Sequence, residues 1–116
     1  MYRYYKSCDI LASLCDWEGC SIVQLEALAS GIPLIATAVG GTPEIIKDPR
    51  NGFLIEREVD SIKDTILKAV QNPELLTEMR QNNLEDSQQF AWENIVKRYF
   101  DVYEGLTPTS ERRRTK

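Results

Sequence analysis

Histidine is absent from this sequence of 116 residues. Without histidine the chain cannot build a Ser-His-Asp or Cys-His hydrolase site, a histidine zinc site, or a histidine acid-base catalyst near neutral pH. Any chemistry must therefore use carboxylates, backbone amides or cationic side chains. The length, with 42% hydrophobic and 28% charged residues, indicates one small globular domain and excludes two domains, a fibrous chain and a disordered chain.

Cysteines and long apolar runs are also few, and the net charge is negative. The three cysteines, Cys8, Cys15 and Cys20, follow neither a C-x-x-C nor a zinc-binding spacing, so we expect no metal site. Residues 1–5 lack the apolar run of a signal peptide, and we expect a reducing, cytoplasmic location. The formal net charge of -4 removes the electrostatic term of non-specific nucleic-acid binding, so no nucleic-acid partner is expected.

Apolar runs and helical patterns alternate along the chain. Short apolar runs predict buried strands at 10–14, 33–37 and 53–55. Between the first two strands, Ser21 and Gln24 fit a capping box, and Gly31 lies where a helix should end. Further helices are predicted at 62–70, after Asn72 as a cap, and from Trp92 to Tyr103, whereas 82–89 is polar and is predicted to be a frayed helix end or a loop.

This alternation predicts an α/β fold, a partial Rossmann-like (doubly wound) parallel sheet of about three strands with flanking helices. Open sheets of this class usually have about five or six strands, so the sequence indicates half of such a domain. We assign it to residues 1–105 and predict a disordered basic tail at 106–116, with membrane association at most peripheral. The aromatic stripe of the last helix is predicted to pack on the chain's own core.

Two loops are candidates for ligand binding, because ligands of doubly wound sheets bind at the carboxyl ends of strands against helix N-termini. One is the loop at 17–20, which leads into the helix capped by Ser21, and the other is the glycine turn at 40–42. In the first loop Gly19 allows close approach to the main chain, and the amides of residues 20–23 would point at a phosphate.

Two glutamates make the first loop more specific. Glu18 precedes the helix and Glu26 lies within its first turns, and carboxylates accept hydrogen bonds from sugar hydroxyls while repelling a bare phosphate. The pair therefore suits a nucleotide sugar, which carries hydroxyls on both sides of its phosphates. The alternative interpretation places Glu18 on a surface turn and Glu26 on a solvated helix face.

The segment 18–37, EGCSIVQLEALASGIPLIAT, followed by GGTPE at 40–44, closely resembles the C-terminal domain of group-one retaining glycosyltransferases with two Rossmann domains (the GT-B fold). The resemblance extends from about Tyr5 to Tyr103. It implies that the chain is the second half of a domain that binds a nucleotide-diphosphate sugar. The activity implied is transfer of that sugar to an acceptor hydroxyl.

By the same resemblance, Glu18 is the catalytic candidate and would accept a hydrogen bond from a donor-sugar hydroxyl. Glu26 would hold the ribose hydroxyls, and amides near Gly19, Cys20 and Ser21 would face the sugar and diphosphate. The helix dipole would stabilise negative charge on the leaving diphosphate. No metal, cofactor or protein nucleophile is expected, because in retaining members the leaving phosphate assists the incoming hydroxyl.

The family's cationic pair for the diphosphate and its acceptor site would lie outside this sequence, so a missing N-terminal domain or a homodimer partner is expected. A non-catalytic nucleotide-binding or assembly module derived from the domain is the alternative, since a truncated parallel sheet exposes an edge and apolar faces. A receiver-like or flavodoxin-like domain is a third possibility, in which the pairing of Glu18 and Glu26 would be coincidence.

Overall fold

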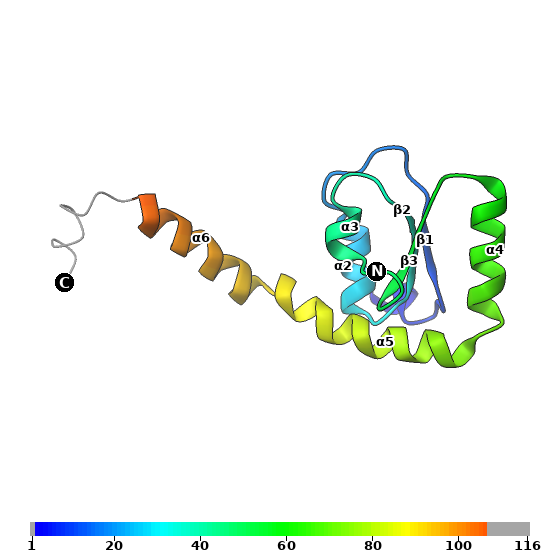
Figure 1. Ribbon diagram of the computed structural model, residues 1–116. Helices are drawn as coiled ribbons and strands as arrows, with labels where there is room; N and C mark the ends of the chain where they lie inside the picture. Colours follow the sequence, from blue (N-terminus) through cyan, green and yellow to red (C-terminus); the bar gives the residue numbers. More distant parts are fainter. Residues whose placement is uncertain (1, 107–116) are drawn as a thin grey trace, which may run out of the picture.

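The computed structural model describes residues 2–106. Their elements alternate between helix and strand, and three parallel strands form one sheet in the order β1-β2-β3 (Figure 1). The predicted α/β class and the partial parallel sheet are confirmed. The bounds in chain order are α1 (Tyr2–Tyr5), β1 (Leu11–Ser13), α2 (Ile22–Ala29), β2 (Leu34–Thr37), α3 (Thr42–Ile45), β3 (Gly52–Ile55), α4 (Val59–Val70), α5 (Pro73–Ser87), the 3-10 turn η1 (Gln88–Phe90) and α6 (Trp92–Leu106).

The central strand β2 is buried along its whole length, because helices cover both faces of the sheet. Its side chains alternate between two cores, as the period of a strand requires. Leu34 and Ala36 pack with Leu28 of α2 and Ile45 of α3, whereas Ile35 packs with Phe53 of β3, Ala69 of α4 and Met79 of α5. The register pairs Leu34 with Leu11 on one side and with Gly52 on the other.

Helix α2 begins and ends as the sequence predicts, but only half of its predicted capping box forms. Ser21 Oγ accepts from Gln24 N at 3.5 Å, and Gly31 adopts a φ of 74° just after the helix, where glycine is favoured. The Gln24 side chain, however, does not return to Ser21 and is directed into the interior. Asn72 occupies the predicted position before α5, yet its side chain makes no capping bond and donates to Lys68 O instead.

The polar segment 82–89 is not a frayed end or a loop, so that prediction is wrong. Helix α5 continues to Ser87 because contacts distant in sequence stabilise it. Asp86 accepts from Arg50 and from Asn51, Asn82 donates to Arg50 O, and Met79 and Asn83 are buried. Arg50 thus ties the turn before β3 to the polar end of α5, and the paired carboxylate of Asp86 raises the pKa of its guanidinium.

Helix α6 contradicts the prediction that its aromatic stripe packs on the chain's own core. It leaves the α/β body as an extension, none of its residues is buried, and Trp92 is 79% exposed (Figure 1). The described chain measures 61 × 26 × 23 Å with a radius of gyration of 18.0 Å, against about 13 Å for a compact chain of this length. Leu106 ends α6 rather than beginning a tail; the rest of the predicted tail, 107–116, lies outside the described residues.

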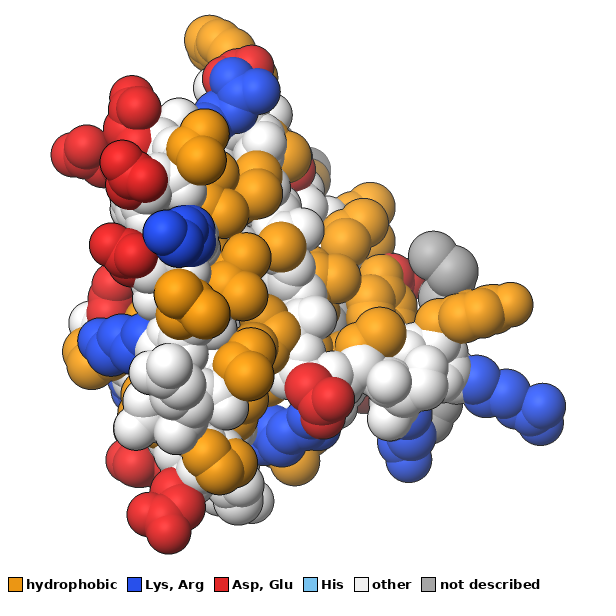
Figure 2. Space-filling view, turned by 90° about the vertical axis from the view of Figure 1, so that its right-hand side faces the viewer, with side chains coloured by type: hydrophobic (Ala, Val, Ile, Leu, Met, Phe, Trp, Pro, Cys, Tyr) orange, Lys and Arg blue, Asp and Glu red, His pale blue; other side chains and the backbone are white. Residues whose placement is uncertain are grey.

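A second apolar surface lies over α4. Figure 2 shows hydrophobic side chains gathered in a band across this side of the molecule. A shallow groove there is lined by Val59, Ile62, Lys63, Ile66 and Leu67. Within residues 2–106, no helix combines the length and the apolar character needed to cross a bilayer.

Candidate functional site

The two predicted loops form one site. Both follow the carboxyl ends of neighbouring strands, β1 and β2, and Gly41 N donates to Gly19 O at 2.9 Å. A Cβ on Gly40 would lie 1.5 Å from Glu18 O, and a Cβ on Gly41 would lie 2.3 Å from Gly19 O. Gly40 also has a φ of 52°, which side chains rarely adopt. Glycine at these two positions therefore allows the loops to touch through their backbones.

Backbone amides at the start of α2 lie beside this junction. Ser21 satisfies two of the first donors, since its Oγ accepts from Gln24 N and its carbonyl from Leu25 N. The N–H groups of Ile22 and Val23 belong to the first turn, where a helix supplies no acceptor of its own. The end of α2 thus offers backbone donors and a positive dipole to an anion.

Glu18 lies in the loop that leads into α2, and its carboxylate already has a partner. Glu18 Oε1 accepts from Gly19 N at 3.1 Å. The Gly19 amide is therefore used inside its own loop in this conformation, whereas the sequence predicted that it would face a ligand. The remaining carboxylate oxygen, Oε2, is the part of Glu18 best suited to accept from an approaching hydroxyl.

Glu26 is exposed on α2 and is oriented by a residue that the sequence analysis missed. The Tyr5 hydroxyl donates to Glu26 Oε2 at 2.8 Å. This hydrogen bond, helped by burial and by the negative charge, raises the pKa of Tyr5 above its ordinary value. Tyr5 belongs to a one-turn helix in an aromatic segment without periodicity, so no sequence signal distinguished it from Tyr4, which is exposed.

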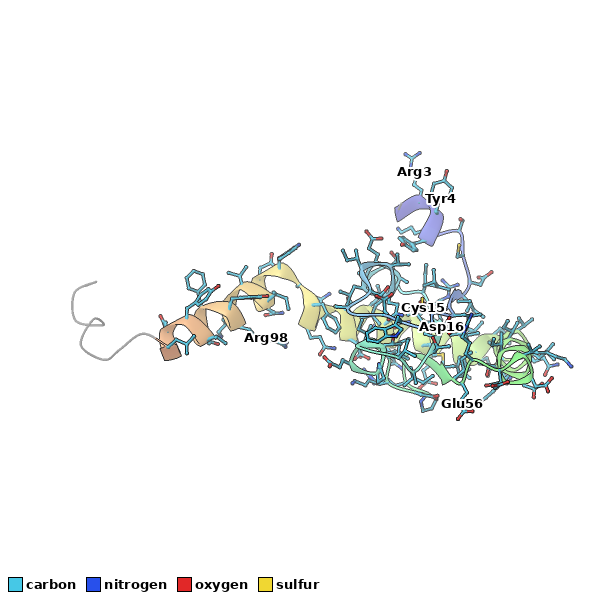
Figure 3. The ribbon with its side chains drawn as sticks, turned by 90° about the horizontal axis from the view of Figure 1, so that it is seen from above. Arg3, Tyr4, Cys15, Asp16, Glu56 and Arg98 are labelled. Atoms are coloured by element: carbon cyan, nitrogen blue, oxygen red, sulfur yellow. The ribbon has the colours of Figure 1, made fainter. Side chains whose placement is uncertain are left out.

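The opposite rim of the site carries an ion pair, also missed. Arg57, after β3, pairs with Asp16, after β1, so the two side chains bridge the carboxyl end of the sheet. Figure 3 looks onto this end: Cys15, Asp16 and Glu56 lie over the sheet, whereas Arg98 lies away from it on α6. Thr37 Oγ1 donates to Cys15 O at 2.6 Å and fixes the backbone beneath.

A hollow beside α2 does not contain the two glutamates. It is an apolar groove of about 610 Å³ between α2 and the segment from α5 to α6. Cys20 and Ile22 line its end nearest the loops, and Phe90, Trp92 and Ile95 line the far side. Glu18, which is half-buried, and Glu26, which is exposed, do not line this groove. Among residues 2–106 no three Cys, Asp or Glu side chains cluster closely enough to hold a metal ion.

Comparisons with known proteins assign the chain to a family. Residues 1–86 match the sequence profile described as Glycosyl transferases group 1. An uncharacterized glycosyltransferase of Methanocaldococcus jannaschii is 36% identical over 105 residues, which cover 90% of this chain and 30% of that protein.

Solved structures show the same fold. Sucrose-phosphate synthase from Thermosynechococcus elongatus is similar with a TM-score of 0.82 and 27% identity, over 89% of this chain and 26% of that one. The Anabaena protein HepE, solved in complex with UDP, is similar in fold with a TM-score of 0.83 and 23% identity, over 90% of this chain and 29% of that one.

The chain spans less than a third of the length of these three proteins and corresponds to their C-terminal part. The resemblance inferred from the glutamate and glycine motifs is therefore confirmed by the family profile and by the fold. With the three parallel strands, the paired glutamates around α2 and the joined glycine loops, the chain belongs to the group 1 family of glycosyltransferases.

Proposed function

We propose that this chain forms part of the donor site of a retaining glycosyltransferase, which transfers a sugar from a nucleotide-diphosphate sugar to an acceptor hydroxyl. One observation carries the proposal: the turn at Gly40 and Gly41 is in backbone contact with the loop that carries Glu18 and leads into α2, while Glu26 lies on α2 itself. An anion binds at such a helix end, and hydroxyl groups bind to carboxylates on either side.

The residues would divide the donor between them. Backbone donors at Cys20, Ser21 and the first turn of α2 face the diphosphate and stabilise the charge that grows on it as the sugar leaves. Glu18 accepts from a hydroxyl of the donor sugar. Glu26, held by the Tyr5 hydroxyl, accepts from the ribose hydroxyls. Gly19 allows the donor to approach the main chain closely, because a Cβ there would meet nothing within 4 Å and the space beside the backbone is open.

Titration of the purified chain with nucleotide diphosphates and nucleotide sugars tests this proposal. UDP and UDP-glucose begin the panel, since HepE, a protein of the same fold, was solved with each of them. We expect Glu26→Ala to weaken binding about tenfold, the loss of roughly one charge-assisted hydrogen bond. The matched control is Glu78→Ala, which removes the same charge from an exposed position on α5. Equal affinities in the two variants would contradict the assignment of Glu26.

A non-catalytic assembly role is the second candidate, and the exposed apolar surfaces favour it. The 610 Å³ groove continues onto Trp92 and Ile95 of α6, and such surfaces on soluble proteins usually mark contacts. We propose that the groove and α6 contact either a missing N-terminal domain or a second copy of the chain. Sedimentation velocity over a hundredfold range of concentration distinguishes these, because a monomer throughout excludes self-association.

We also propose a reducing, cytoplasmic location. All three cysteines are free, and Cys8 and Cys20 are exposed. Exposed unpaired thiols persist where glutathione and thioredoxin keep them reduced. Thiol titration of protein taken directly from cells, without added reductant, tests this: three reactive thiols after denaturation are expected.

A further inference from the structure

Gln24 links the three elements that carry the two joined loops. Its side chain is 1% exposed, although it lies in the first turn of α2 beside residues that face solvent. Gln24 Nε2 donates to Ser13 Oγ at 3.0 Å and to Thr42 Oγ1 at 3.2 Å. Ser13 ends β1 and Thr42 begins α3, so this one amide joins the end of a strand and the starts of two helices.

The buried Gln24 amide uses only one of its two polar atoms in hydrogen bonds within the described residues. Gln24 Oε1 has no hydrogen-bond partner among residues 2–106, and a buried acceptor without a partner destabilises the folded state. An apolar side chain of the same length would avoid that penalty. What glutamine adds is two directed hydrogen bonds beneath the junction where Gly41 N meets Gly19 O.

We infer that Gln24 is a positioning residue of the donor site, which fixes the loop that carries Glu18 against the turn at Gly40 and Gly41. It acts through Ser13 and Thr42 and touches no ligand, since its side chain is buried. The expected effect of Gln24 on donor binding rests on the proposed function. The positioning of the loops is measurable without a ligand.

Hydrogen exchange of the Gly41 amide is the first test. Gln24→Met keeps the length and shape of the side chain but removes both hydrogen bonds, so we expect this amide to exchange about tenfold faster while amides of β2 and β3 stay within twofold. Thr42→Val removes one partner and is the second variant if Gln24→Met fails to fold. The matched control is Asn83→Leu, because Asn83 is a buried amide on α5 whose side-chain atoms have no hydrogen-bond partner within the described chain.

Nucleotide affinity is the second test, with UDP as the probe. We expect three- to tenfold weaker binding in Gln24→Met and in Thr42→Val, and no further loss in the double variant, because both changes break the same contact. A uniform rise in exchange across the sheet would overturn the inference, since Gln24 would then contribute to global stability alone. So would unchanged Gly41 exchange together with unchanged affinity.

The two proposals fail separately. If the wild-type chain binds no nucleotide but Gln24→Met speeds exchange at Gly41, the positioning role is upheld and the proposed function is not. If the wild-type chain binds UDP and Gln24→Met binds it equally well with Gly41 exchange unchanged, the proposed function is upheld and the positioning role is wrong.

Discussion

Replacing Gly40 by alanine tests the contact that joins the two loops. The new Cβ would lie 1.5 Å from Glu18 O, whereas real Cβ atoms essentially never come within 3.0 Å of another heavy atom. The loops must therefore separate by about 1.5 Å. Alanine at a φ of 52° adds a conformational cost of about 1–2 kcal/mol, and loss of the bond from Gly41 N to Gly19 O adds about 1 kcal/mol.

We expect Gly40→Ala to lower the free energy of unfolding by about 2–3 kcal/mol, which corresponds to a fall in Tm of about 10 °C or more for a domain of this size. Such a loss leaves the chain folded if its stability is typical, about 5–15 kcal/mol. The assay is thermal unfolding followed by circular dichroism. Gly19→Ala is the matched control in the opposite loop, since its Cβ would meet nothing within 4 Å. Equal Tm values for the two variants would refute the argument that the loops are in backbone contact.

Three further predictions concern the core, a buried amide and pH. Leu28 is 0% exposed, and Leu28→Ala should lower the free energy of unfolding in urea by about 2–5 kcal/mol. Trp92→Ala, on exposed α6, should lower it by less than about 0.5 kcal/mol. Similar losses in the two variants would mean that α6 packs on the body. Asn51→Ala should cost about 2–3 kcal/mol, because the buried Asn51 side chain bonds Lys47 N, Ile45 O and Asp86, whereas the exposed Asn94→Ala should cost less than about 1 kcal/mol in the same assay. The pKa of Tyr5 is raised above 10.0, the ordinary value for tyrosine, so its bond to Glu26 stabilises the fold fully below pH 10.0, and this stabilisation is lost as pH rises through the pKa of the folded state. Measured from pH 9 upward, the free energy of unfolding should therefore fall less steeply with pH in Tyr5→Phe than in the unchanged chain. Parallel curves would exclude the bond to Glu26.

The sheet and its flanking helices were predictable because their signals are local. The run at 34–37 places apolar residues on both faces of the strand, a pattern typical of a strand that helices cover on both sides. Gly31 follows α2 with the positive φ that glycine favours. The family motif then located Glu18 and Glu26. A segment was predictable wherever its own residues determine its conformation.

The sequence-based predictions are wrong where contacts between residues far apart in the chain determine the conformation. Residues 82–87 are polar apart from Leu84 and lack an apolar stripe, yet they are helical because Arg50 and Asn51, more than thirty positions earlier, bind Asp86. Gln24 fitted a capping box, yet Ser13 and Thr42 offer its amide buried partners. The joining of the two loops likewise depends on which strands are neighbours, and a list of motifs does not contain that information.

Helix α6 shows a further limit of periodicity. An amphipathic pattern states that a helix has an apolar face but not which surface covers it. Trp92, Val96 and Phe100 would give the same pattern whether they packed on this domain or on another one, and here they are exposed. Stability measurements on this chain therefore report mainly on the α/β body, because no residue of α6 is fully buried. The role of α6 has to be measured through association, where its apolar face would be removed from water.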